Sequence, residues 1–378
     1  MRLIALLLAG VLGLSVAAAP TAAQPAAKSV TPRAVVLNDS LKSPWGLAFL
    51  PDGRMLVTEK PGSLLLLDAT GKRTLATLAV PPVSFRNQGG LLDVAVDPDF
   101  PRDPWIYWTY AEPGAEQGLA GTAIARGRLV GNALEGIEVI YRQVPKTTGA
   151  GHYGARIVFL PDKTMFVTLG ERQKLDPAQD LDTTLGKVIR ITRDGSVPAG
   201  NPGVSKTRPE IWSYGHRNPQ GAALRPSTDP KAADLWLNEH GPQGGDELNR
   251  VLPGRNYGWP KVSYGCPYGA PRGEACRYGG GTHEPAYEPP VSYWVPTSMA
   301  PSGLVFYSGR RFPQWKGDAL MGALAGTAVW RVRLDGNREV ARERLFGDLR
   351  ERVRDIREGP DGYLYLVTDS GKLIQIRD

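Results

Sequence analysis

Side chains that can bind an anion or accept a proton recur at one phase of an internal repeat in this 378-residue chain. Each lies six to ten positions before the turn proline of its own repeat, in the connection that leads into a strand. If these connections meet around one axis, a base, polar amide groups and three guanidinium groups converge, which suits a planar polyanion. Dispersed polar side chains on solvated loops are the alternative. The residues concerned are Gln88, His152, Arg217, Asn218, Arg352 and Arg354.

His152 is the candidate base of this set. Glycines flank it, so the backbone can approach closely and a substrate can lie beside the ring. An unperturbed imidazole, with a pKa of about 6.5, can take a proton at neutral pH. A packing or solvated histidine is the alternative. The other histidines are His216, His240 and His283. They show no H-x-x-x-H spacing, so we expect no zinc site.

The segment 149–154, Gly-Ala-Gly-His-Tyr-Gly, matches the G-x-G-x-x-G fingerprint of dinucleotide-binding folds. That fingerprint requires a preceding strand and a following helix, whose N-terminus meets the phosphates. Here Ala-Arg-Ile-Val-Phe-Leu-Pro-Asp follows, which is a strand and a turn. The context therefore argues against a nicotinamide cofactor.

Residues 238–260 are rich in oxygen-bearing side chains and in glycine. Calcium prefers carboxylates and backbone carbonyls, and a glycine-rich turn can direct successive carbonyls inward. Glu239, Asp246 and Glu247 offer carboxylates. Acidic loop residues in water are the alternative.

Six copies of one pattern must position these residues: a glycine, an alternating apolar strand, a Pro-Asp-Gly-like turn and a second strand. The turns lie near Pro51, Pro98, Pro161, Pro226, Ser308 and Pro360. Proline presets φ, aspartate bonds its own backbone and glycine takes the positive φ, so each copy contains a β-hairpin. The spacing leaves room for four strands per copy, which predicts an all-β, six-bladed propeller of four-stranded antiparallel blades. An open array would expose strand edges that a closed ring hides.

We expect the propeller to be a single domain, residues 24–378, closed by pairing of residues 34–37 with the last blade. A long inserted loop around residues 257–300 should overhang one face, where substrate contacts are common. The loop contains Cys266 and Cys276, which can form a disulfide in an oxidising compartment; two free thiols are the alternative.

Residues 1–23 read as a secretory signal peptide, because Arg2 precedes a short apolar run and small residues follow it. An uncleaved N-terminal anchor is the alternative. We therefore expect a periplasmic or secreted protein, with no transmembrane segment in the mature chain. The net charge of +7 is dispersed among acidic residues, and with export it argues against a nucleic-acid partner.

Several long phrases resemble the glucose/sorbosone dehydrogenases, specifically the branch of soluble aldose sugar dehydrogenases that use pyrroloquinoline quinone (PQQ). The resemblance runs from about Pro44 to the C-terminus. The phrases are QGGLLDVAVDPDF, GHYGARIVFLPD, GKVIRI, GHRNPQG, EHGPQGGDE, NYGWP, APSG and RVRDIREGPDGYLY.

The resemblance implies oxidation of an aldose sugar at C1 to the lactone, with hydride transfer to C5 of PQQ and an electron acceptor other than NAD, as yet unknown. His152 would be the general base, and Arg217 would stabilise charge at the C5 carbonyl. The implied PQQ contacts are Gln88, Arg217, Asn218, Arg352 and Arg354. One Ca²⁺ would clamp PQQ through the carbonyls of Gly241 and Pro242, and a second, structural Ca²⁺ would bind Glu247 and the backbone of Tyr257.

Two positions depart from the family pattern. Glu171 stands where members of the family often carry an aspartate that orients the base, and the glutamate side chain is one methylene longer. Ala325 follows Gly-Ala-Leu where some members carry a lysine that contacts the cofactor, so a cation is lost. Two other functions stay open: a calcium-dependent propeller lactonase and a noncatalytic sugar-binding propeller.

Overall fold

The computed structural model describes residues 31–227, 234–273 and 275–378. The expected signal peptide, residues 1–23, lies outside these ranges. Residues 32–378 form one compact body of six four-stranded antiparallel sheets, arranged as a six-bladed propeller. The all-β prediction and the number of blades are confirmed. The described helices are three 3₁₀ turns: η1 (Asp176–Ala178), η2 (Pro313–Trp315) and η3 (Gly347–Leu349).

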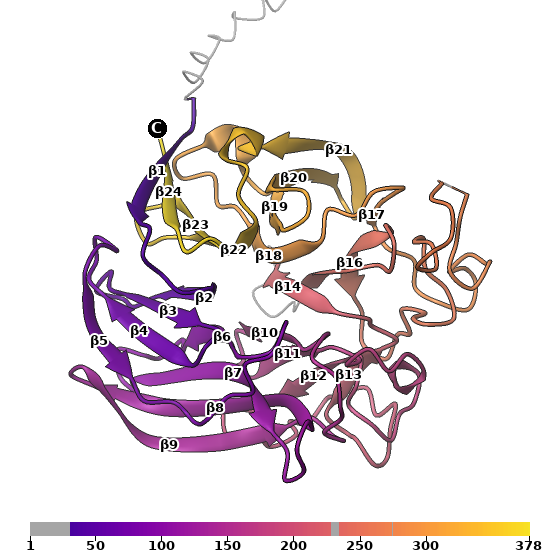
Figure 1. Ribbon diagram of the computed structural model, residues 1–378, viewed down its shortest axis with the longest axis horizontal. Coiled ribbons are helices and arrows are strands. Elements are labelled where there is room, and N and C mark those ends of the chain that lie inside the picture. The colour runs from indigo at the N-terminus through magenta and orange to yellow at the C-terminus, as the bar shows by residue number, and fades with distance from the viewer. Residues whose placement is uncertain (1–30, 228–233, 274) are drawn as a thin grey trace, which may run out of the picture. The chain divides into compact units, whose positions relative to one another are not determined.

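The blades follow one another along the chain, and in each the first strand lies nearest the centre of the ring (Figure 1). Blade 1 holds β2 (Pro44–Phe49), β3 (Met55–Glu59), β4 (Ser63–Leu67) and β5 (Thr74–Leu78). Blade 2 holds β6 (Leu91–Val96), β7 (Trp105–Pro113), β8 (Ala120–Val130) and β9 (Ala133–Arg142). Blade 3 holds β10 (Gly154–Phe159), β11 (Met165–Leu169), β12 (Lys187–Ile191) and β13 (Ile211–Tyr214).

Blade 4 holds β14 (Pro219–Leu224), β15 (Leu235–Glu239), β16 (Asp246–Val251) and β17 (Ser292–Trp294). Blade 5 holds β18 (Pro301–Phe306), β19 (Ala319–Ala323), β20 (Ala328–Asp335) and β21 (Arg338–Leu345). Blade 6 holds β22 (Val353–Glu358), β23 (Leu364–Thr368) and β24 (Leu373–Arg377), and its fourth strand is β1 (Arg33–Asn38) from the other end of the chain. Ala34 pairs with Ile376, so the expected ring closure is confirmed.

The Pro-Asp-Gly turns fold as their residues predict. In blade 1 the Gly53 N–H donates to the Leu50 carbonyl at 2.9 Å, and Gly53 has a φ of +87°. Asp52 accepts the Arg54 backbone N–H at 3.0 Å, which closes the hairpin between β2 and β3. These bonds are local, and this is why the turns could be read from the sequence.

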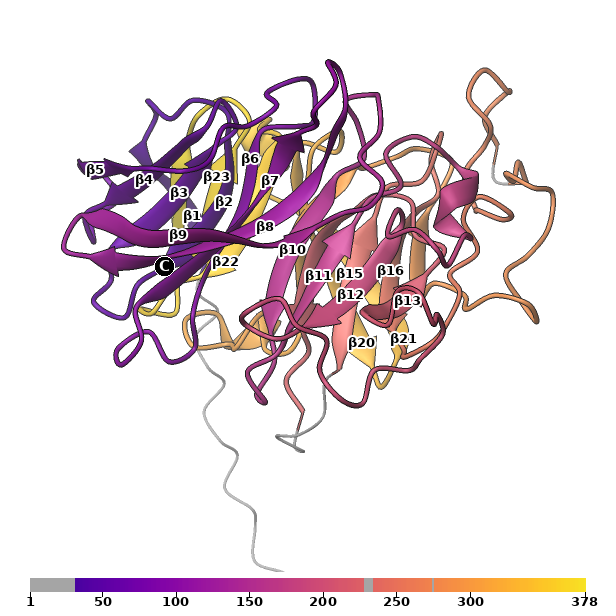
Figure 2. The same ribbon diagram turned by 90° about the horizontal axis from the view of Figure 1, so that it is seen from below.

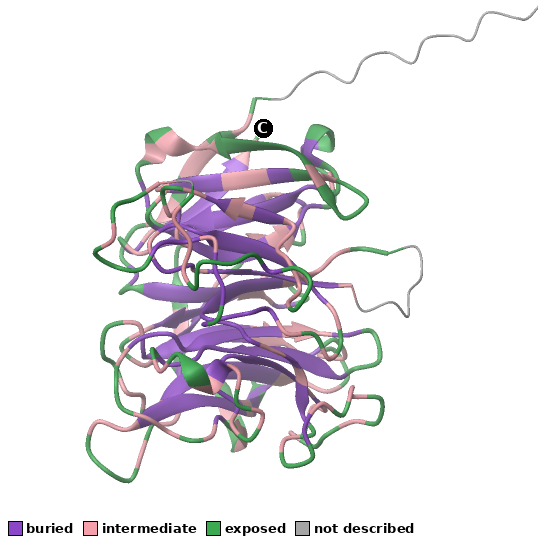
Figure 3. Ribbon diagram, turned by 90° about the vertical axis from the view of Figure 1, so that its right-hand side faces the viewer, coloured by how far each residue is buried: buried purple, intermediate pink, exposed green. Residues whose placement is uncertain are grey.

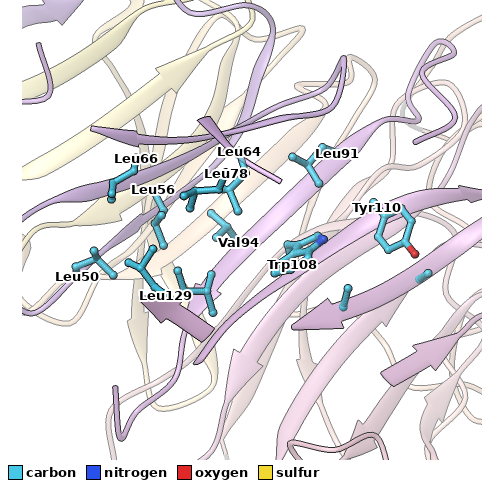
Figure 4. Packing of buried hydrophobic residues seen from close by; sticks show 13 residues of the cluster. Leu50, Leu56, Leu64, Leu66, Leu78, Leu91, Val94, Trp108, Tyr110 and Leu129 are labelled. Atoms are coloured by element: carbon cyan, nitrogen blue, oxygen red, sulfur yellow. The ribbon is translucent and has the colours of Figure 1, made fainter. Parts of the chain in front are cut away.

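Apolar side chains pack between neighbouring blades. Leu56 and Leu64 of blade 1 meet Val94 and Trp108 of blade 2 in one cluster, shown in Figure 4. Figure 3 shows the same arrangement over the ring: the strands are largely buried, and the exposed residues lie mainly in the connections. The sheets are therefore held face to face, and the connections are free to carry other side chains.

Buried ion pairs join the inner strands at the axis. The Arg156 guanidinium in β10 lies 2.9 Å from the Asp93 carboxylate in β6 and 3.0 Å from the Asp355 carboxylate in β22. Arg357 binds the same two carboxylates, at 3.0 and 2.9 Å. Asp355 also accepts the Leu47 N–H of β2 at 3.1 Å. Blades 1, 2, 3 and 6 are thus locked together at the axis, which fixes the positions of the connections at its ends.

Residues 252–291 leave blade 4 after β16 and return at β17. Figures 1 and 2 show this segment, in orange, projecting beyond the strands. Among the described residues, no helix has the length and apolar character that a membrane crossing requires.

Candidate functional site

The connections that lead into β6, β10 and β14 meet at one end of the axis. The Gln88 side-chain oxygen accepts the backbone N–H of His152 at 2.8 Å, and the Asn218 amide lies 3.5 Å from the same oxygen. Asn218 in turn accepts the Gly154 N–H at 3.2 Å. The structure therefore brings together three of the residues that the sequence places at one repeat phase.

The His152 ring is oriented by a carboxylate. Its Nδ1 is hydrogen-bonded to Glu171 Oε1, and the histidine is 5% exposed. Burial lowers the pKa of His152 below its ordinary 6.5, and the nearby Arg217 acts in the same direction, while the bond to Glu171 opposes both. The ring is neutral at neutral pH. With Nδ1–H donated to the carboxylate, the Nε2 lone pair remains, and no described residue is hydrogen-bonded to it.

Glu171 reaches the ring because its loop folds against the His152 backbone. A Cβ at the preceding Gly170 would lie 2.2 Å from the His152 carbonyl oxygen, so this close approach requires glycine. Glu171 Oε2 accepts the backbone N–H groups of Lys174 and Leu175, the latter at 2.7 Å. Burial raises the pKa of Glu171, but the hydrogen bond from His152 and these backbone donors outweigh burial and hold it below 4.5. The glutamate is therefore an ionised acceptor, despite its extra methylene.

Arg217 is held from both ends. Its backbone N–H donates to Glu239 at 2.6 Å, and its guanidinium donates to the His240 carbonyl and to the Tyr268 hydroxyl, both at 3.1 Å. The guanidinium also lies 5.1 Å from the centre of the Trp259 ring, and the arginine is 5% exposed. A cation is thus fixed beside His152, where it can stabilise a developing negative charge.

A second cluster lines a cavity of about 340 Å³ at the same end of the ring. Arg352 and Arg354 both bind the Asp369 carboxylate, at 2.9 Å each, and Arg354 also donates to Gln220 at 2.7 Å. The cavity lining comprises Trp45, Lys60, Asn87, Gln88, Gln220, His240, Ala300, Leu324, Arg352, Arg354 and Asp369. Because Gln88 lines this cavity and contacts His152 and Asn218, the two clusters form one site.

Three of the four expected calcium ligands lie around a much smaller cavity, of about 10 Å³, and Pro242 is not among the residues that line it. Gly241, Glu247 and Tyr257 line it, together with Glu239. Burial, and then the neighbouring Glu239 carboxylate, raise the pKa of Glu247 well above its ordinary value. The Asn249 amide lies 3.2 Å from each of these two carboxylates and is shared between them. The described residues contain no group of three or more His, Cys, Asp or Glu that could hold a metal ion by side chains alone.

Asp246, a further candidate carboxylate, has a structural role. One of its oxygens accepts the Gly241 N–H at 3.0 Å. The other accepts the Ser298 hydroxyl and the N–H groups of Met299 and Ala300, at 2.7, 2.7 and 2.8 Å. Asp246 therefore ties the Gly241 turn to the connection before β18.

A disulfide joins Cys266 and Cys276, as predicted, with the Cα atoms 5.2 Å apart. The backbone of Cys266 pairs with that of Gln243, at 3.0 and 3.1 Å, which fastens the insertion to the turn that carries Gly241. Tyr268 lies inside the disulfide loop and contacts Arg217.

The sequence analysis did not identify several residues of the site, among them Lys60, Tyr268, Asp369 and Gln220. Tyr268 had a signal, since it lies between the two cysteines of the predicted overhanging loop. Gln220 had a signal as well, since it lies six positions before Pro226, within the repeat phase that located the others. Lys60 and Asp369 had none, because they fall outside that phase.

Comparisons with known proteins agree over most of the chain. The Glucose / Sorbosone dehydrogenase family model matches residues 41–375. The aldose sugar dehydrogenase YliI of Escherichia coli K12 is 42% identical over 349 residues, which cover 90% of this chain and 91% of that protein. A crystal structure of a glucose dehydrogenase matches with a TM-score of 0.83 and 46% identity, covering 91% of this chain and 99% of the other. The PQQ-bound form of an aldose sugar dehydrogenase from Streptomyces coelicolor matches with a TM-score of 0.74 and 30% identity, covering 92% and 98%.

Proposed function

The chain belongs to the glucose/sorbosone dehydrogenase family of PQQ-type sugar dehydrogenases, and from this premise we propose that it oxidises aldose sugars at C1 with PQQ and Ca²⁺. The product is the lactone, and the electrons pass to an acceptor other than NAD. The observation that carries this proposal is the buried hydrogen bond between His152 Nδ1 and Glu171. His152 is joined through Gln88 to the cationic cavity, which Gln88 lines.

His152 acts as the general base. Glu171 holds the ring with Nδ1–H toward the carboxylate, so Nε2 takes the proton from the anomeric hydroxyl. Glu171 then stabilises the imidazolium that forms. PQQ, when bound, would supply the two-electron acceptor for the hydride from C1 of the sugar. His152 is 5% exposed, so little of the residue is in contact with bulk water.

The positive groups of the site would hold the cofactor. Arg352, Arg354 and Gln88 line the larger cavity, and Asn218 is linked to it through Gln88. Arg217 would lie near the carbonyl at which negative charge develops, because its guanidinium is fixed by His240 and Tyr268. A tricarboxylate fits this set better than a neutral ligand does.

Two calcium ions would be held mainly by backbone carbonyls. No described residue donates a hydrogen bond to the carbonyls of Gly241, Pro242 or Tyr257, so these oxygens are available as ligands. The first two would hold the ion that binds PQQ, as a Lewis acid. Tyr257 and Glu247 would hold the second, structural ion, which would neutralise the buried Glu247 beside Glu239.

The mature protein would be residues 24–378, released into the periplasm or secreted after removal of residues 1–23. The disulfide supports an oxidising compartment. Among the described residues, the disulfide is the feature that bears on where the protein is located.

Reconstitution tests the function. Metal-free protein is mixed with PQQ, Ca²⁺ and an aldose, and reduction of an artificial dye is followed. We expect dye reduction only when both PQQ and Ca²⁺ are present, and a rise in Tm on adding them, since a ligand of the native state stabilises it. No reduction and an unchanged Tm would refute the proposal. Lactone hydrolysis without PQQ would instead indicate a lactonase, and sugar binding without either reaction a noncatalytic propeller.

A further inference from the structure

Lys60 brings a cation into the larger cavity from blade 1. It lies in the turn between β3 and β4, and it lines the cavity with Arg352, Arg354 and Asp369. Its ammonium group donates to the Asn87 carbonyl, one residue before Gln88. This contact directs Nζ toward the residues that are expected to touch the cofactor.

The charge of the cavity depends on this lysine. The lining residues include three cations and one carboxylate, Asp369, which binds both arginines. Lys60 forms no ion pair with any carboxylate of the described residues, and only one of its three N–H groups is hydrogen-bonded to them.

The Lys60 ammonium group lies 5.8 Å from the centre of the Phe85 ring and feels the Asp369 carboxylate without forming an ion pair with it. An ammonium group without an ion-pair partner is costly to bury unless an anion accompanies it. Burial lowers the pKa of Lys60 below 10.5, and the neighbouring Arg354 lowers it further. An anionic ligand would remove this penalty and accept the two remaining N–H groups. Leu324 lines the same cavity, and the next residue is Ala325, where some family members carry a lysine. Lys60 therefore supplies a positive charge to a cavity that lacks the family's lysine at position 325.

We infer that Lys60 is a cofactor-binding residue that pairs with a carboxylate of the bound quinone tricarboxylate. The inference rests on the proposed function, because it takes PQQ as the occupant of the cavity. It adds a residue from blade 1 to a site that the repeat phase builds from blades 2, 3, 4 and 6. Charge, and not only shape, would then set the affinity for PQQ.

The test measures PQQ binding directly, by equilibrium dialysis with Ca²⁺ present and no sugar. Lys60→Gln should raise the Kd for PQQ about tenfold, since a hydrogen bond between charged groups is lost. Lys60→Arg should stay within about threefold of the wild type, because it keeps the charge. Lys72→Gln is the matched control: it removes one exposed charge from the turn between β4 and β5, at the other end of the blade.

Ionic strength separates a charge effect from a structural one. The wild-type Kd should rise more steeply with salt than that of Lys60→Gln, because one ionic contact is missing in the variant. A lysine that only holds the Asn87 carbonyl would leave this slope unchanged. Lys60→Met serves as a second variant if Lys60→Gln does not fold, as judged by the Tm of the PQQ-free protein.

The outcomes distinguish the two proposals. If the wild type binds PQQ and Lys60→Gln binds it with equal affinity and salt slope, the role of Lys60 is refuted while the proposed function stands. If the wild type itself binds no PQQ, the proposed function fails, and the role of Lys60 fails with it.

Discussion

His152 Nδ1 and Glu171 Oε1 are hydrogen-bonded in a buried position, and this contact fixes which ring nitrogen faces the substrate. Glu171→Gln should keep the volume but remove the charge that stabilises the imidazolium. We expect kcat to fall by about 10- to 100-fold, with the Kd for PQQ unchanged, because the cofactor is held by other residues. Steady-state kinetics and equilibrium dialysis on the same preparation check this. An unchanged kcat would show that Glu171 does not orient the base.

Removal of the base itself should have a larger effect. His152→Ala should still bind PQQ, while turnover falls by about 10²- to 10⁴-fold, the range of general-base catalysis. A histidine that only packs would behave in the opposite way: its loss would lower the Tm and leave turnover of the folded fraction nearly intact. Near-normal turnover with PQQ bound would remove His152 from the mechanism.

The pH dependence of kcat should report His152. Only the neutral ring accepts a proton, so kcat falls as the pH drops through the pKa of His152. Because burial lowers that pKa, the acid limb should lie below pH 6.5. The bond to Glu171 raises the pKa, so Glu171→Gln should move the limb to still lower pH. A limb that does not move between the two proteins would contradict this assignment.

Calcium should stabilise the protein through Glu247 even without PQQ. Ca²⁺ would neutralise a carboxylate that lies buried near Glu239 and Asp246. Adding Ca²⁺ to chelator-treated protein should therefore raise the Tm, and Glu247→Gln should abolish most of that rise. Glu339→Gln, a change on the edge strand β21, is the control and should leave the rise intact. An equal rise in the wild type and Glu247→Gln would place the structural ion elsewhere.

The disulfide should matter more for the site than for stability. The two cysteines are separated by 10 positions, so the closed loop is short, and we expect replacement of both by serine to cost no more than about 3 kcal/mol of unfolding free energy. The loop carries Tyr268, which contacts Arg217, so the same variant should show weaker PQQ binding. Mass spectrometry without reductant should find the wild-type cysteines joined. Two alkylatable thiols in protein from the periplasm would contradict the pairing.

The sequence by itself determined the fold and the outline of the site. The turn at Asp52-Gly53 and its counterparts depend on hydrogen bonds between residues two to four positions apart, so a short stretch of sequence is enough to predict them. Six copies of the strand–turn–strand pattern in one chain leave little choice but a closed ring. The ring then places residues of one repeat phase at one end of the axis, which is why Gln88, His152 and Asn218 meet as expected.

Only the tertiary structure decided how the charges of the site are paired. Arg354 donates to Gln220, 134 positions away, and it shares Asp369 with Arg352. Lys60 enters the cavity from a turn outside the repeat phase. Such pairings depend on the angle at which neighbouring blades pack and on the rotamer of each long side chain. Neither leaves a local pattern in the sequence, because both are set by contacts between residues that are distant along the chain.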